Sequence, residues 1–251
     1  AEDGIRDRSP SRGLGDVYKR QVQADRLDRS APPAAPDRRL AAAIVEFNCL
    51  PGRYAHDSWF AVLPRGALLL RLRESPRVAQ RLSRELLAAW GLEGHYCFDF
   101  SAPSARLALL DGSTLAQLVL YAGLTATAAY VRRAVERDKM AALKQRLGEP
   151  ALLFALKRAP FLSGVAPLPD ALHRASPDAF HQITLLAGLQ CLAASLKGQE
   201  RALRRRLLLK FPQGWAAAFA PSKATPPPAA CARLFDQLLL EFAPQWAHLA
   251  A

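Results

Sequence analysis

The adjacent residues His56 and Asp57 have the clearest potential for chemistry in this sequence. A histidine beside a carboxylate could belong to a catalytic or metal-binding constellation. No recognisable motif supplies a third partner, so the structural interpretation is favoured. In that interpretation Asp57 caps a short helix that carries Trp59 and Phe60, and His56 is half exposed. The catalytic interpretation is the alternative.

The remaining candidates for catalysis or metal binding are scattered. The five histidines, at 56, 95, 173, 181 and 248, form no close pair, and the sequence has no phosphate loop, dinucleotide-binding, nucleophile-elbow or zinc-protease motif. The four cysteines, at 49, 97, 191 and 231, form no C-x-x-C pair, which favours separate reduced thiols in a cytosolic protein. We therefore expect no enzyme activity, no catalytic residues, no metal, no cofactor and no small-molecule substrate.

The most basic stretch runs from residue 197 to 210. On a helix, Arg201, Arg204 and Arg205 share one side with Lys197, while leucines line another. We predict that Arg201, Arg204 and Arg205 bind an acidic protein partner. Two alternatives stay open: a solvated amphipathic helix with no partner, and a nucleic-acid-binding helix. The last is less favoured, because aromatic residues that could stack on bases are absent from within the stretch.

The net charge supports the same group of partners. The chain has 34 basic and 22 acidic residues, a formal charge of +12. Without residues 1–21, 29 basic and 18 acidic residues leave +11, so the excess belongs to the body of the protein. Such a charge suits an acidic protein, nucleic acid or an anionic membrane surface.

The helices that would position these residues are organised around residues 106–135. No charged side chain occurs between Gly112 and Val131, and the preceding Asp111 supplies N-cap chemistry. A second nearly uncharged run covers residues 179–196. Either run could be a membrane span or a buried helix. Polar residues such as Gln117 and Gln190 dilute both runs, so we predict two core helices packed on each other.

Leucine and alanine dominate the 51% of apolar residues, which favours helices over sheet. We predict an all-α fold, a single irregular helical domain. Short extended segments compete with helix near 68–73, where leucines and arginines alternate, and near 95–100. Helices are also expected at 40–47, after Ser75-Pro76, at 150–158, from Ser176-Pro177 and around 234–242, with the central helix continuing to Leu147. The four tryptophans are predicted to be core anchors.

Three segments flank or interrupt this domain. Residues 1–21 resemble the translation of a sequencing-library adaptor, and we expect them to be non-native and the natural N-terminus to be missing. Residues 22–38 contain a proline-rich run and are predicted to be a disordered lead-in. The helical domain then covers 39–251, with a proline-rich linker at 221–228.

Several stretches resemble the K component of type III secretion systems, the SctK/YscK family of sorting-platform proteins. Phe47-Asn48-x-x-Pro51-x-Arg53-Tyr54-x-His56-x-Ser58-Trp59 is similar to the family's opening signature. Residues 107–111, 120–124 and 131–133 resemble its central helices. Residues 188–194 and Arg204-Arg205-Arg206-Leu207-x-Leu209-x-Phe211-Pro212 resemble its C-terminal part. The resemblance covers about residues 40–220 and leaves out the last helix.

This resemblance implies a non-enzymatic cytosolic adaptor of the sorting platform. Family members join the cytoplasmic domain of the inner-membrane ring protein to the pod-forming, flagellar-switch-like protein. The expected partners are these secretion-apparatus proteins, at the cytosolic face of the inner membrane, and the membrane is reached only through them. A basic helical nucleic-acid-binding protein is the alternative, and an orphan helical enzyme comes third.

Overall fold

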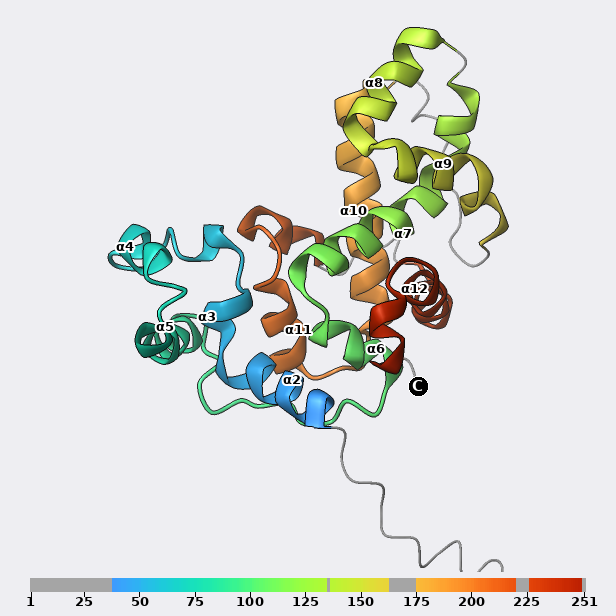
Figure 1. Cartoon of the computed structure of the whole chain (residues 1–251). Helices are drawn as coiled ribbons and strands as arrows, with labels where there is room; N and C mark the ends of the chain where they lie inside the picture. Colours follow the sequence, from blue (N-terminus) through green and yellow to red (C-terminus); the bar gives the residue numbers. More distant parts are fainter. Residues whose placement is uncertain (1–37, 135, 163–174, 220–225, 250–251) are drawn as a thin grey trace, which may run out of the picture. The chain divides into compact units, whose positions relative to one another are not determined.

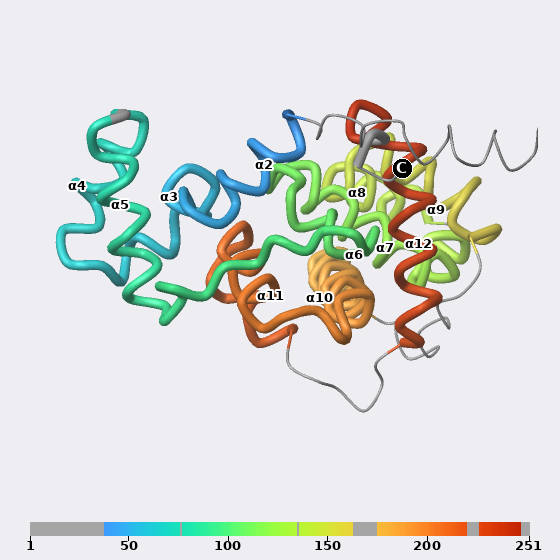
Figure 2. The backbone as a smooth tube through the Cα atoms, turned by 90° about the horizontal axis from the view of Figure 1, so that it is seen from below, coloured from blue at the N-terminus to red at the C-terminus, as the bar shows by residue number. Residues whose placement is uncertain are grey.

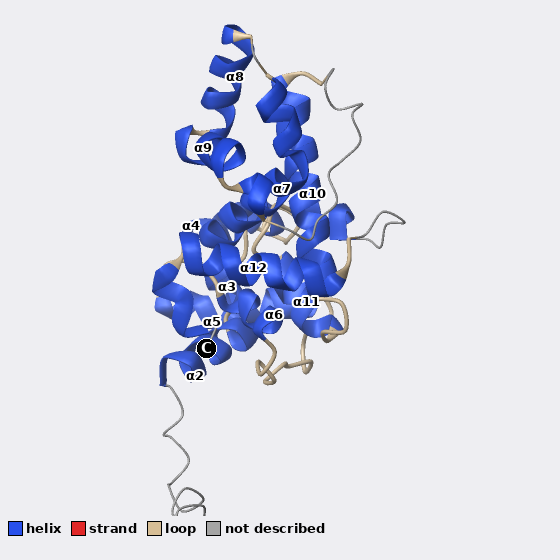
Figure 3. Cartoon of the chain, turned by 90° about the vertical axis from the view of Figure 1, so that its right-hand side faces the viewer, coloured by secondary structure: helices blue, strands red, loops and turns tan. Residues whose placement is uncertain are grey.

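The structure is a computed structural model that describes residues 38–134, 136–162, 175–219 and 226–249. Within these residues every regular element is a helix and there is no strand, as Figure 3 shows, so the predicted all-α class is confirmed. Residues 42–251 form one compact unit, separate from residues 1–41. The predicted segment 1–21, all of the predicted lead-in at 22–38 except Arg38, which begins α2, and most of the predicted linker at 221–228 lie outside the described residues.

Figure 1 shows the order of the elements. The α-helices are α2 (Arg38–Cys49), α3 (Pro51–Tyr54), α4 (Gly66–Arg71), α5 (Pro76–Ala89), α6 (Pro103–Arg106), α7 (Gly112–Arg133), α8 (Arg137–Leu147), α9 (Glu149–Lys157), α10 (Pro177–Ser195), α11 (Arg201–Leu208) and α12 (Pro228–Phe242). Short 3₁₀ turns lie at η1 (Asp57–Trp59), η2 (Leu107–Leu109), η3 (Ala159–Phe161), η5 (Gln213–Phe219) and η6 (Pro244–Leu249).

Helices α7 and α10 are the two longest elements described and lie side by side (Figures 1 and 2). Both begin at the predicted caps, since Asp111 accepts the Thr114 N–H and Ser176 accepts the Ala179 N–H. They cross at two glycines, where the absence of side chains lets the backbones touch. A Cβ atom at Gly123 would lie 1.9 Å from the carbonyl oxygen of Thr184. The predicted buried helix pair is therefore confirmed.

Among the described residues, α7 is the single helix that is long and apolar enough to cross a membrane, with a mean hydropathy of 1.3 over its best window. Two thirds of that window, 67%, is buried inside the protein. Helices α9 and α12 cover α7 on the side where the Tyr121 ring stacks on Phe242 at 4.2 Å and packs against Phe154 at 4.8 Å. The apolar surface of α7 is thus largely buried by packing against other helices.

A second group of buried side chains joins α5 to the turns around it. Trp59, Phe60, Leu82 and Leu86 form its centre, and the edge of Trp90 meets the Trp59 ring at 4.5 Å. Trp59 is the one tryptophan that is fully buried in the described part of the chain. Trp90, Trp215 and Trp246 are half buried, so the prediction of four core anchors was correct only for Trp59.

Near 68–73 the sequence left a short extended segment and a helix open, and the structure has a helix. Residues 66–71 form α4, where a left-handed residue, Arg65, and the close approach of Gly66 to the Phe60 carbonyl start a helical turn. The alternation of leucines in α4 leaves Leu68 exposed instead of marking a sheet face. The prediction that the central helix continues to Leu147 is wrong, because the helix ends at Arg133 and a separate helix, α8, follows.

Candidate partner-binding surface

Helix α11 carries the predicted arginines and is shorter than the basic stretch that predicted it. It spans Arg201–Leu208, and Lys197 lies in the turn before it rather than on the helix. Leu203 and Leu207 are fully buried and fix which side of the helix faces the protein. The N-cap residue, Glu200, makes no side-chain hydrogen bond to the helix, so the position of α11 depends on packing and on the contacts of the residues that follow it.

Residues 56–59 hold the segment that follows α11, residues 209–213, by hydrogen bonds. The His56 N–H donates to the Leu209 carbonyl at 2.6 Å, and the Trp59 indole N–H donates to the Phe211 carbonyl at 2.7 Å. The Gln213 N–H donates to the Ser58 hydroxyl at 2.9 Å. Residues 56–59 and residues 209–213, more than 150 positions apart in the sequence, thus form one clamp.

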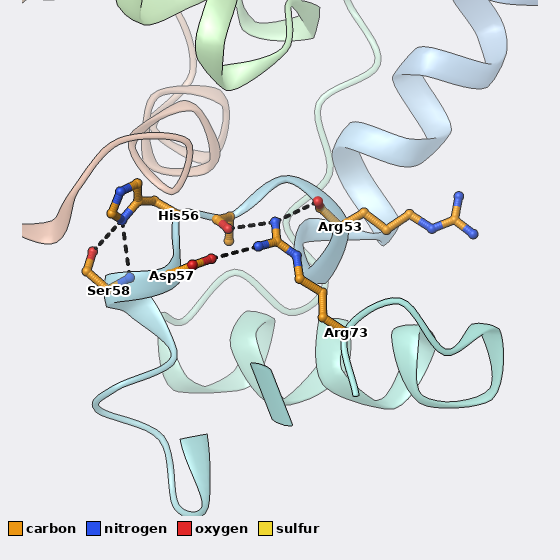
Figure 4. Close-up of polar contacts among 6 residues, drawn as sticks. Arg53, His56, Asp57, Ser58 and Arg73 are labelled. Atoms are coloured by element: carbon orange, nitrogen blue, oxygen red, sulfur yellow. Dashed lines mark hydrogen bonds and ion pairs between the residues drawn. The ribbon is translucent and has the colours of Figure 1, made fainter. Parts of the chain in front are cut away.

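The adjacent side chains of His56 and Asp57 bond to different partners rather than to each other (Figure 4). His56 Nδ1 accepts the Ser58 N–H at 3.2 Å and lies 2.9 Å from the Ser58 hydroxyl. Asp57 instead accepts from Arg73 at 2.9 Å. The structural interpretation needs two corrections: His56 rather than Asp57 caps the η1 turn, and His56 is exposed rather than half exposed.

Arg73 explains why Asp57 is turned away from the histidine. Its guanidinium also donates to the carbonyls of Arg53, at 2.7 Å, and Ala55, at 2.9 Å, so it closes the loop that leads into the clamp (Figure 4). Asp57 Oδ1 is engaged by Arg73, whereas the His56 ring bonds to Ser58, so the two side chains have different partners. These residues hold the backbone in place.

Two basic side chains of the stretch face inward, which the helical-wheel argument did not predict. Arg206 is fully buried and donates to the carbonyls of Leu92, at 3.1 Å, and Asn48, at 3.4 Å. Lys210 is also buried and donates to the carbonyls of Ala108 and Leu110. Burial lowers the pKa of Lys210 from 10.5 to about 7 and also lowers the pKa of Arg206. Carbonyl oxygens, rather than carboxylates, accept these hydrogen bonds from both cations.

The three predicted site residues lie on the other side of α11. Arg201 and Arg204 are exposed, and Arg205 is half buried with Nη1 donating to the Trp90 carbonyl at 3.4 Å. Arg201 and Arg205 line a shallow pocket of about 140 Å³ together with His95. The structure therefore brings these arginines to one surface, as predicted, and holds Arg205 in place; whether the surface binds a partner remains a prediction.

Two exposed aromatic residues beside this surface were missed from the sequence. Tyr96 and Phe98 lie in the segment between α5 and α6, which passes α11 (Figure 2). Asn48 holds this segment: its side chain donates to the Cys97 carbonyl at 2.6 Å and accepts the Cys97 N–H at 2.8 Å. The only sequence signal was the weak alternation at 95–100, which is consistent with Cys97 buried between two exposed rings.

The groups that could hold a cofactor or metal are few in the described part of the chain. No cluster of three His, Cys, Asp or Glu side chains occurs there. A pocket of about 460 Å³ at the start of α7 is lined by Arg73, Lys210 and Asp111. Both of its inward basic groups already donate to carbonyls or to Asp57, and Asp111 is engaged in capping α7. The four cysteines are free, although Cys191 and Cys231 lie against each other rather than apart.

Comparison with known proteins gives one family. The family model described as YOP proteins translocation protein K (YscK) matches residues 42–246. The match starts within α2 and ends within η6, so it includes α12, which the resemblance seen in the sequence left out. Neither the curated proteins nor the solved structures contain a match.

Proposed function

Because the chain belongs to the YscK family of type III secretion proteins, we propose that it is a non-enzymatic, cytosolic adaptor of the secretion sorting platform. In this proposal it links the cytoplasmic domain of the inner-membrane ring protein to the pod-forming, switch-like protein. It would lie at the cytosolic face of the inner membrane and reach the membrane only through these partners. The matched region covers the clamp, α11 and the central helix pair, which are the parts that the proposal uses.

The observation that carries the proposal is the arginine surface of α11: Arg201, Arg204 and Arg205. The buried leucines, the clamp and Arg206 all fix the helix from its inner side. A fixed surface loses little conformational freedom on binding, which favours recognition. Clustered positive charge attracts an acidic partner, speeds the encounter and sets the orientation of the complex. The surface therefore suits an adaptor that docks onto a protein of opposite charge.

Reversing the three arginines tests this proposal. The variant Arg201→Glu, Arg204→Glu, Arg205→Glu should bind its partner at least about ten-fold more weakly at low salt, because attraction becomes repulsion. Its melting temperature should fall only slightly, since Arg201 and Arg204 are exposed and Arg205 makes one long hydrogen bond, 3.4 Å, to the Trp90 carbonyl. The measurement is the affinity for the purified ring-protein cytoplasmic domain and for the pod protein, at two salt concentrations.

A matched control changes the net charge equally at a different place. Arg71, Arg77 and Arg84 are all exposed on or beside α4 and α5. Reversing these three to glutamate should leave partner affinity close to that of the wild type once the general effect of net charge is screened by salt. Equal weakening by both triple variants, or none by the α11 variant, would remove this surface from the interface.

A further inference from the structure

We propose that the partner is recognised by a composite surface, in which Tyr96 and Phe98 receive an apolar side chain while Arg201 and Arg205 bind acidic residues of the same segment. This inference rests on the proposed function and specifies the chemistry of the partner: an acidic protein segment with an apolar anchor. It places the energetic centre of the interface on the aromatic pair, beside the arginines that the sequence indicated.

The two aromatic rings are exposed on a backbone segment that hydrogen bonds hold in place. Tyr96 is 46% exposed and Phe98 65% exposed, and their ring centroids lie 6.1 Å apart. The two hydrogen bonds between Asn48 and the Cys97 backbone hold the chain between them. Large aromatic side chains that are fixed before binding are frequent hot spots, because they bury much area at little entropic cost.

Arg206 supports one side of the aromatic pair. Its guanidinium carbon lies 5.7 Å from the centroid of the Tyr96 ring, an arrangement that cation–π attraction stabilises. Arg206 is fully buried, and its Nη1 atom finds no hydrogen-bond acceptor among the described residues. Beneath Tyr96 there is thus a fixed positive charge with an incomplete set of acceptors. This charge adds to the attraction for an acidic segment that covers the rings.

The exposed arginines lie beside the start of the segment that carries the rings. His95, which precedes Tyr96, lines the 140 Å³ pocket together with Arg201 and Arg205. Arg205 is tied to the Trp90 carbonyl, just before the segment that carries the rings. In this proposal a short peptide places an apolar side chain on the rings and a carboxylate on the arginines, and neither the ring-bearing segment nor α11 has to move far.

The acidic residues around the rings distinguish a protein segment from nucleic acid. Glu93 and Asp99 are exposed and flank the aromatic pair in the sequence, and the exposed Glu200 precedes α11. A nucleic-acid strand whose bases stack on the rings must carry its regularly spaced phosphates past these carboxylates, which repel them. A peptide can place its acidic residues only where the arginines lie. The charge pattern therefore favours a protein partner.

The test compares variants of the full chain for binding to two purified proteins, the ring-protein cytoplasmic domain and the pod protein. Phe98→Ser removes the more exposed ring and should weaken binding to at least one of them by about ten-fold or more. Tyr96→Ser is the second variant, and Phe161→Ser is the matched control, because Phe161 is 78% exposed on η3. Thermal melts of all variants check that they are folded, and a single-stranded DNA oligonucleotide is the third probe.

The outcomes separate this inference from the proposed function. Weaker partner binding for Phe98→Ser, with Phe161→Ser unchanged and the melts unaltered, supports the composite surface. Partner binding that needs the arginines but not the rings overturns the inference and leaves the adaptor function standing. A wild-type chain that binds neither protein overturns both. Ring-dependent retention of the DNA, without ring-dependent partner binding, overturns the inference in favour of nucleic acid.

Discussion

Substituting alanine for Gly123 or Gly188 should lower the free energy of unfolding by about 3 kcal/mol or more. This is at or above the largest loss that extra atoms in a packed core usually cause. The added Cβ at Gly188 would lie 1.9 Å from the Val119 carbonyl oxygen, and the Cβ at Gly123 equally close to the Thr184 carbonyl oxygen. Both obstacles are helix backbone, which cannot rotate away as a side chain can. The helices α7 and α10 must separate, and the packing around their crossing is lost.

Denaturant unfolding measures this effect, and Gly214→Ala is its control. Gly214 has no atom within 4 Å of the position that a Cβ would take, so its substitution should change stability little. The Thr127 and Thr184 hydroxyls, 3.1 Å apart at the same crossing, should also lose their hydrogen bond in the glycine variants. A Gly123→Ala protein as stable as Gly214→Ala would show that the helices do not cross at these glycines.

The second large effect concerns pH and Lys210. The pKa of this buried ammonium group is lowered to about 7, whereas an unfolded lysine titrates near 10.4. Between these values the unfolded chain binds a proton at Lys210 that the native protein does not. Stability should therefore rise with pH from about 7, by up to about 1.4 kcal/mol per pH unit from this group. From pH 7.5 to 9 the gain is about 2 kcal/mol.

The variant Lys210→Met isolates this contribution, because methionine keeps an apolar chain of similar length and cannot titrate. Its unfolding free energy should rise less steeply with pH than that of the wild type, while Lys157→Met, at an exposed site, should keep the wild-type slope. The pKa values of Cys191 and Tyr54 are raised in the native state, so stability falls as these groups ionise in the unfolded chain, for a cysteine from about pH 8.5. Wild type and Lys210→Met share this loss, so the difference between their slopes isolates Lys210. Equal slopes for wild type and Lys210→Met would refute the buried, depressed lysine.

The central helix pair could be predicted because its signals are local. Asp111 and Ser176 are caps next to long uncharged runs, and such runs must be buried somewhere. The sequence did not reveal that Gly123 faces Gly188, since the contact depends on how two separate helices meet. The alternating leucines of α4 were ambiguous for the same reason: their neighbours decide whether a short apolar run becomes helix or strand.

The candidate surface was predicted only in part. Helical spacing correctly placed Arg201, Arg204 and Arg205 on one side of α11, because spacing is a local property. It could not show that Arg206 turns inward to meet carbonyls that lie more than 100 positions earlier in the chain. It also could not bring Tyr96 beside α11, because that contact depends on the Asn48 hydrogen bonds to Cys97.

The most direct test of the adaptor proposal is site-specific crosslinking in a host that assembles the secretion system. In one variant a photo-reactive amino acid replaces Arg204, which is exposed on α11. In the control variant the same amino acid replaces Phe161, which is exposed on η3. We predict that position 204 crosslinks to the ring protein or the pod protein and that position 161 gives much less of the same product. Crosslinks from position 204 to neither protein, in cells that secrete normally, would contradict the account.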